Sequence, residues 1–307
     1  MNQSLGRFSF LLVGIMVWMG CHSDPVTPTP PVYNPNDSIH YLTITGRHIQ
    51  MARAGEAYGL WYRYGADSVW QLGSSFTQLY SAPADSLQRL YGYFILHGSL
   101  DSISAVQLTL DPLSGPRVPT SHIATGTLSG GRDSVRGVMA AAASFSAFGA
   151  TSADVIFVSS TSDTNRAQHE FYLADQGTGG LTASLQSLPL PPIDWIYALW
   201  VTDSNFYPRH KFLYGTFASA SGHDSDSLND AYPFPGGFRT NDLDVPGGNI
   251  LITLEPKFSL SSLRTSGPSG VNILSLPLPR FITNGETLAM KNVAATTVPT
   301  VAIIIKR

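Results

Sequence analysis

Beyond His40, hydrophobic and polar positions follow the pattern of strands and turns rather than of helices. Alternating or β-branched runs occupy residues 41–45, 105–110, 154–158, 249–254 and 301–305, and clusters of Gly, Pro, Asp and Ser bound them. The best helical candidate, the Ala-rich segment 138–148, suits either one short helix or a strand of small residues. Many short strands with frequent turns predict an all-β protein built of antiparallel β-sandwiches of the immunoglobulin-like kind.

An internal repeat divides this pattern in two. Tyr58-Gly59-Leu60-Trp61 returns as Tyr197-Ala198-Leu199-Trp200, and the later segment Leu108-Thr109-Leu110-Asp111-Pro112 returns as Ile252-Thr253-Leu254-Glu255-Pro256. Large residues on both faces of the Tyr-x-Leu-Trp strand predict a central strand with the tryptophan in or near a core. The acidic residue before proline is suited to accept hydrogen bonds from loop amides and to fix a turn. The repeat predicts two modules, residues 39–186 and 187–307, with the boundary in the Pro-rich segment 184–192.

The first 38 residues have the features of a targeting segment. Arg7 precedes an apolar run over residues 8–19, which is too short to span a bilayer but suits a signal peptide. Gly20 then precedes Cys21, the only cysteine. Residues 1–20 resemble a bacterial lipoprotein signal, which implies that Cys21 becomes a lipidated N-terminus. The alternative is an ordinary signal peptide with an incidental cysteine.

Residues 21–38 are rich in proline and lack apolar periodicity, which predicts an extended, semi-rigid tether. The expected protein is therefore a globular body held to a membrane by its lipid, in the bacterial cell envelope and facing the periplasm or the exterior.

Composition narrows the function classes further. Only 13% of residues are charged and the formal net charge is −3, so the basic footprint needed for nucleic acid is missing. Long helical bundles and coiled coils need a higher density of charged helix formers. The single cysteine leaves no intramolecular disulfide, and the body must fold on its hydrophobic core.

The landmarks of the repeat carry a family resemblance. Residues 55–61 read Gly-Glu-Ala-Tyr-Gly-Leu-Trp, and the strand end Thr109–Pro112 is followed by Pro119-Thr120. In these motifs the chain resembles the extracytoplasmic domain of anti-sigma-K-type factors. Duplicated bacterial lipoproteins with two such units also carry a Pro-Phe-Pro-Gly stretch, which here is residues 233–236. The resemblance implies a β-sandwich outside the cytoplasm. The sigma-binding domain and membrane helix of those factors are missing, which argues against direct binding of a sigma factor.

Sequence signatures of catalysis were not found. The chain has no Gly-x-Ser-x-Gly elbow, His-Glu-x-x-His helix, Walker loop or dinucleotide fingerprint. We therefore expect a non-enzymatic binding, sensing or structural module that contacts an envelope protein or a glycan. One alternative is a carbohydrate-binding or hydrolytic lipoprotein with a site assembled from loops. Another is a sensory partner of an anti-sigma system.

Two groups of residues are candidate sites. Asp224, Asp226 and Asp230 lie in an acidic loop that either binds Ca²⁺ or is a solvated loop of Asx-turns, and no other cofactor is expected. Aromatic residues in a Pro/Gly-rich loop of the second module form a candidate ligand surface, namely Tyr232, Phe234 and Phe238. The aromatic residues of the first module are expected mostly in its core: Tyr62, Tyr64, Trp70, Phe76, Tyr80, Tyr91 and Tyr93.

Overall fold

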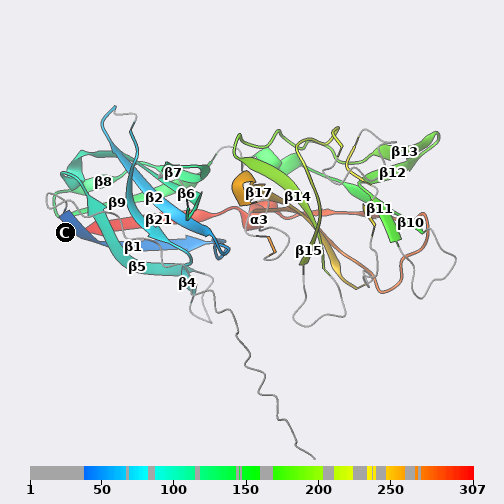
Figure 1. Cartoon of the computed structure of the whole chain (residues 1–307), viewed down its shortest axis with the longest axis horizontal. Coiled ribbons are helices and arrows are strands. Elements are labelled where there is room, and N and C mark those ends of the chain that lie inside the picture. The colour runs from blue at the N-terminus through cyan, green and yellow to red at the C-terminus, as the bar shows by residue number, and fades with distance from the viewer. Residues whose placement is uncertain are drawn as a thin grey trace, which may run out of the picture. The chain divides into compact units, whose positions relative to one another are not determined.

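The computed structural model is nearly all β, and its strands pair antiparallel (Figure 1). It describes residues 38–66, 69–81, 87–114, 118–142, 145, 147–159, 169–202, 211–223, 234–236, 238–239, 247–259, 267–268 and 271–307. Each of the five runs predicted from alternation lies in a strand. The predicted all-β class is therefore confirmed, while the immunoglobulin-like form of the modules stays a prediction.

The first sheet has ten strands and closes into two layers. Its order is β3-β2-β6-β7-β9-β21-β1-β5-β4, with β8 beside β9. β9 belongs to both layers, because its first part pairs with β21 and its last two residues pair with β7. Across the interior, the rings of Tyr62 and Phe94 lie 5.2 Å apart. The strands are β1 (Ser38–Arg47), β2 (Glu56–Tyr64), β3 (Gln71–Phe76), β4 (Tyr80–Ser81), β5 (Gln88–Leu96), β6 (Ile103–Pro112), β7 (Ser121–Gly126), β8 (Ser129–Gly131), β9 (Ser134–Ala141) and β21 (Thr300–Lys306).

The remaining strands form a five-stranded sheet, β15-β14-β17-β18-β20, a four-stranded sheet, β16-β11-β10-β19, and the hairpin β12–β13. Phe171 of β11 and Tyr214 of β15 bring the two larger sheets together, with ring centroids 6.2 Å apart. The strands are β10 (Asp154–Ser159), β11 (His169–Tyr172), β12 (Ala174–Gly177), β13 (Gly180–Ala183), β14 (Trp195–Thr202), β15 (Lys211–Phe217), β16 (Phe238–Arg239), β17 (Asn249–Pro256), β18 (Val271–Pro277), β19 (Thr287–Ala289) and β20 (Lys291–Asn292).

Helical segments in the described residues are single turns. They are η1 (Leu100–Ser102), η2 (Ala147–Ala150), η3 (Lys257–Ser259) and α3 (Ala294–Thr297). The Ala-rich segment 138–148, for which the sequence left helix and strand open, is a strand in its first part, where it completes β9. η2 then begins at Ala147.

The internal repeat is visible in the pairing. β2 lies between β3 and β6, and β14 lies between β15 and β17 in the same way. In each copy the register toward the next strand shifts just before the tryptophan, between Leu60 and Trp61 and between Leu199 and Trp200. Both tryptophans are buried, as the alternation predicts.

Strand pairing does not follow the predicted boundary between residues 186 and 187. β10 and β11 precede that boundary, yet they pair with β19 and β16, which follow it. β21, at the end of the chain, inserts between β1 and β9 of the first sheet. The physical reason is that β21 alternates apolar and exposed residues, so it can join two strands that would otherwise leave open edges. Residues 33–307 form one compact unit.

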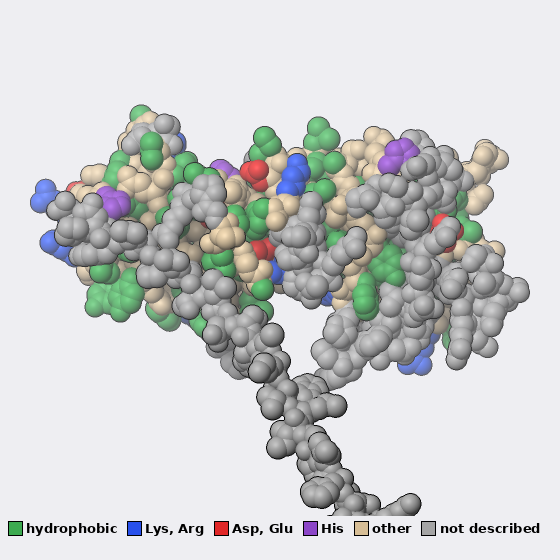
Figure 2. Space-filling model, viewed as in Figure 1, with side chains coloured by type: hydrophobic (Ala, Val, Ile, Leu, Met, Phe, Trp, Pro, Cys, Tyr) green, Lys and Arg blue, Asp and Glu red, His purple; other side chains and the backbone are tan. Residues whose placement is uncertain are grey.

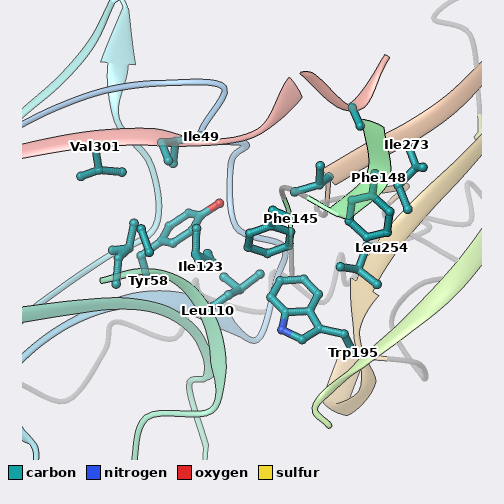
Figure 3. Close-up of a cluster of buried hydrophobic side chains, with 14 of the residues drawn as sticks. Ile49, Tyr58, Leu110, Ile123, Phe145, Phe148, Trp195, Leu254, Ile273 and Val301 are labelled. Atoms are coloured by element: carbon teal, nitrogen blue, oxygen red, sulfur yellow. The ribbon is translucent and has the colours of Figure 1, made fainter. Parts of the chain in front are cut away.

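One large hydrophobic cluster runs through this unit, and two smaller clusters lie beside it around Tyr172 and Trp200. Figure 3 shows Tyr58, Leu110 and Ile123 of the first sheet close to Phe145 and Trp195. The rings of Phe145 and Trp195 meet edge to face, with centroids 5.4 Å apart. A cavity of about 10 Å³ lies here, which is room for one water molecule at most. The two copies of the repeat therefore share their interior.

Candidate functional site

The first landmark motif forms a partly buried hydrogen-bond network. The indole Nε1 of Trp61 donates to Thr109 Oγ1 at 2.8 Å and to Asp111 Oδ2 at 2.9 Å. The other oxygen of Asp111 accepts from the backbone N–H of Thr120 at 2.9 Å and from its hydroxyl at 2.8 Å. The predicted role of this acidic residue in fixing a turn is confirmed at Asp111. The network therefore joins β2, β6 and the turn before β7.

The second copy of the motif uses its acidic residue differently. Trp200 Nε1 donates to Thr253 Oγ1 at 2.9 Å, and Thr253 Oγ1 donates to Glu255 Oε1 at 2.6 Å. Glu255 Oε2 accepts a hydrogen bond from Arg53 Nη2 at 2.7 Å. Arg53 belongs to the loop before β2, so this copy of the motif ties the first sheet to the second half of the chain.

Arg53, Glu56 and Glu255 form a buried charge cluster. Arg53 Nε lies 3.2 Å from Glu56 Oε1, and the backbone N–H of Arg53 donates to Glu56 Oε2 at 3.0 Å. Burial raises the pKa of nearby Tyr58 far above its usual value, and the charges of Glu56 and Glu255 raise it further. Its phenol therefore stays protonated and donates to the backbone carbonyl of Gln50 at 2.8 Å. The guanidinium between the two carboxylates gives this cluster a structural role.

A Ser–His pair also occurs in β1. Ser38 Oγ and His40 Nε2 are 2.8 Å apart. Desolvation lowers the pKa of buried His40, and the positive charge of Arg307 lowers it further. A hydrogen bond with the backbone of Lys306 raises this pKa, but by less. Within the described part of the chain, no carboxylate is hydrogen-bonded to His40. The pair therefore lacks the third group that orients the histidine in a hydrolytic triad.

Of the candidate residues predicted from sequence, most fall where the structure gives no description. Cys21, Asp224, Asp226, Asp230 and Tyr232 lie outside the described residues, and so does the side chain of Phe238, whose backbone lies in β16. Among the described residues, no three His, Cys, Asp or Glu side chains gather to hold a metal ion. The calcium hypothesis thus stays a prediction.

The structure corrects the expected exposure of Phe234. Its side chain is only 6% exposed and packs with Ile156, Tyr172 and Ala174. Gly236, two residues on, lies so close to Tyr172 that an added Cβ would be 2.5 Å from its ring. Residues 234–236 thus pack on Tyr172, and Phe234 is not available as a ligand contact.

The exposed aromatic surface lies instead on the first sheet. Tyr41, Tyr80, Tyr91 and Tyr93 are exposed by 65%, 65%, 73% and 66%, contrary to the expectation that the last three belong to the core. Tyr41 lies directly opposite Tyr93 across the β1–β5 pair, with ring centroids 6.1 Å apart and planes tilted by 40°. Alternation explains the arrangement, because their neighbours Leu42 and Phe94 fill the core.

Exposed aliphatic residues extend this surface across the sheet. They are Ile39 on β1, Ile304 on β21 and Val138 on β9. We call these seven residues, the four tyrosines and the three aliphatic residues, the tyrosine face. Figure 2 shows hydrophobic side chains projecting from this part of the molecule. An exposed apolar surface of this kind is a candidate site of interaction.

Charge on the same strands is one-sided. β1, β4, β5, β9 and β21 contain Arg47, Arg89, Arg136 and Lys306 and no Asp or Glu. These cations occupy the same alternate positions as the exposed residues of the tyrosine face. These strands therefore carry a net positive charge, whereas the formal net charge of the whole chain is −3.

Neither a protein-family model nor a curated protein matches this chain. Among the residues that the structure describes, no helix has the length and apolar character needed to cross a bilayer.

Proposed function

We propose that the protein is a non-enzymatic lipoprotein of the bacterial cell envelope. In this proposal Cys21 carries the lipid, residues 21–38 are the tether, and the body is an extracytoplasmic binding, sensing or structural module. The signal-like sequence ahead of Cys21 supports the anchor. The compact unit formed by residues 33–307 supports a body that is separate from the anchoring segment.

The tyrosine face is the observation that carries the binding role. Exposing the apolar rings of four tyrosines to water is unfavourable. A bound partner would cover the rings and leave the hydroxyl groups in water at the edge of the contact. Exposed aromatic residues are also the side chains most enriched where proteins bind partners. The relevant partners are components of the envelope, either a surface, a protein or a glycan.

A carbohydrate-binding role is the second candidate, because tyrosine rings on one sheet can stack on sugar rings. The 40° tilt between Tyr41 and Tyr93 makes a poorer platform for stacking than two coplanar rings would. The hydrolytic form of this alternative gains little from the Ser38–His40 pair, which lacks a carboxylate partner in the described residues.

Mass spectrometry of the mature protein tests the anchor. We expect the N-terminal peptide to begin at Cys21 and to carry acyl chains, and we expect Cys21→Ala to abolish the acylated form. A mature N-terminus at another residue, or an unmodified Cys21, would overturn the lipoprotein proposal. Cleavage at another residue together with release into the soluble envelope fraction would instead indicate an ordinary secreted protein.

A further inference from the structure

We propose that the tyrosine face docks on the surface of an anionic lipid bilayer. This inference rests on the proposed envelope location and names what the exposed face binds. The face combines the three features that a bilayer interface recognises: amphipathic rings, aliphatic side chains and cations on the same side of the sheet.

The tyrosines suit the chemistry of the interface. Tyrosine is enriched at the level of lipid headgroups, because its ring is apolar and its hydroxyl stays hydrated. Tyr91 and Tyr93 are successive outward residues of β5, and Tyr41 pairs with Tyr93 on the neighbouring strand. Ile39 and Ile304 flank them on β1 and β21. The outward side of the sheet thus presents rings and aliphatic groups together, and a bilayer interface can accept them whether or not the rings are coplanar.

The cations supply charge complementarity. Arg89 lies opposite Tyr80 across the β4–β5 pair, and Arg136 lies opposite Ile304 across the β9–β21 pair. Lys306 follows two residues beyond Ile304 on the same strand. Each Lys or Arg held near an anionic leaflet strengthens binding by roughly fivefold. These strands carry no Asp or Glu, so no negative charge on them offsets the attraction of the cations to anionic lipids.

The position of β1 directly after the predicted tether also favours a membrane as the binding partner of the tyrosine face. β1 begins at Ser38, immediately after the predicted tether, and its second and fourth residues are Ile39 and Tyr41 of the tyrosine face. A polyproline tether over the residues between Cys21 and β1 would reach roughly 50 Å at about 3.1 Å per residue. A body held at that distance meets the bilayer surface at a high effective concentration, so even weak docking would be well populated.

Vesicle binding tests the proposal without the lipid anchor. Residues 33–307, which form one compact unit, are floated with vesicles of phosphatidylcholine alone or of phosphatidylcholine mixed with phosphatidylglycerol. We expect binding to the anionic vesicles, little binding to the neutral ones, and weakening at high salt. Arg89→Gln combined with Arg136→Gln should weaken binding by roughly 10- to 30-fold. Tyr41→Ser combined with Tyr93→Ser should weaken it by about tenfold.

Matched variants elsewhere on the surface provide the control. Ile193 and Phe281 are 86% and 85% exposed, and neither lies in a strand of the first sheet. Ile193→Ser combined with Phe281→Ser should leave vesicle binding unchanged. All the substituted residues are at least partly exposed, so melting midpoints should confirm that each variant is folded.

Several results would overturn the proposal. These are absence of vesicle binding, equal binding to neutral and anionic vesicles, and an equal loss of binding in the control variant. Binding to a soluble polysaccharide but not to vesicles would assign the face to a glycan. A dimer lost in Tyr41→Ser/Tyr93→Ser, without vesicle binding, would assign it to a second copy of the chain. Because Cys21 is absent from residues 33–307, failure here leaves the lipoprotein proposal to its own test.

Discussion

Gly59 shows how one residue sets the geometry of the first landmark motif. An added Cβ would lie 2.3 Å from Asp111 Oδ2 and 2.4 Å from Trp61 Nε1, so the indole can reach the carboxylate only over a glycine. The second copy has Ala198 at this position, and among the described residues Trp200 Nε1 donates to Thr253 and not to the carboxylate. The two networks therefore differ at two positions: glycine against alanine beside the tryptophan, and Asp111 against the longer Glu255, which binds Arg53.

We predict that Gly59→Ala destabilises the protein by about 1–3 kcal/mol, because the methyl group displaces the Trp61–Asp111 hydrogen bond. Urea unfolding followed by tryptophan fluorescence measures the change. Gly92→Ala in β5 is the matched control, since nothing lies within 4 Å of an added Cβ there, and it should be neutral or slightly stabilising. Equal midpoints for Gly59→Ala and the wild type would contradict the steric argument.

His40 is expected to make stability depend on pH. Burial lowers its pKa in the folded state below the usual 6.5, so the unfolded chain binds more protons as pH falls through that value. Folding stability should therefore decrease from pH 7.5 toward pH 5. In His40→Asn the decrease should be shallower, as measured by urea unfolding at both pH values. An unchanged slope in His40→Asn would locate the pH dependence elsewhere.

At the scale of the elements, the sequence predicts strands better than it predicts their faces or partners. β5 carries large residues at both alternate sets of positions, with Phe94 and Leu96 on one set and Tyr91 and Tyr93 on the other. Only the pairing of β5 with β1 determines which set turns inward. The sequence did not predict the tyrosine face for this reason, because a strand rich in aromatic residues suits a core as well as an exposed surface. The repeat was readable because its landmarks are local.

The role of β21 could not be read locally either, since it depends on contacts with β1 and β9 far away in sequence. We predict that Ile303→Ala, at a residue 1% exposed in the core, costs about 2–5 kcal/mol through the cavity it leaves. Its neighbour Ile304, 37% exposed, is the control, and Ile304→Ala should cost less than about 1 kcal/mol. Denaturant midpoints measure both. A small effect of Ile303→Ala would mean that β21 is dispensable for the first sheet.

For the molecule as a whole, the charge cluster is the most specific link between the two copies of the repeat. Arg53 precedes β2 of the first copy, whereas Glu255 is the penultimate residue of β17 in the second, and the two form an ion pair at 2.7 Å with both side chains buried. A buried ion pair adds little to stability when compared with apolar residues of the same size, but loss of one partner is costly. We therefore expect the cluster to determine the relative position of the two halves more than the stability of the fold.

We predict that Arg53→Met destabilises the protein by about 3–5 kcal/mol, because it leaves Glu56 and Glu255 buried without their cation. Adding Glu255→Gln to Arg53→Met should recover part of this loss, since one of the two buried charges is then removed. Arg132→Met is the control: the exposed Arg132–Asp101 pair is 3.8 Å apart, and its loss should cost less than about 1 kcal/mol. Urea unfolding of the four proteins, wild type included, gives the comparison. If Arg53→Met and Arg132→Met cost the same, the halves are held together by their shared apolar core alone.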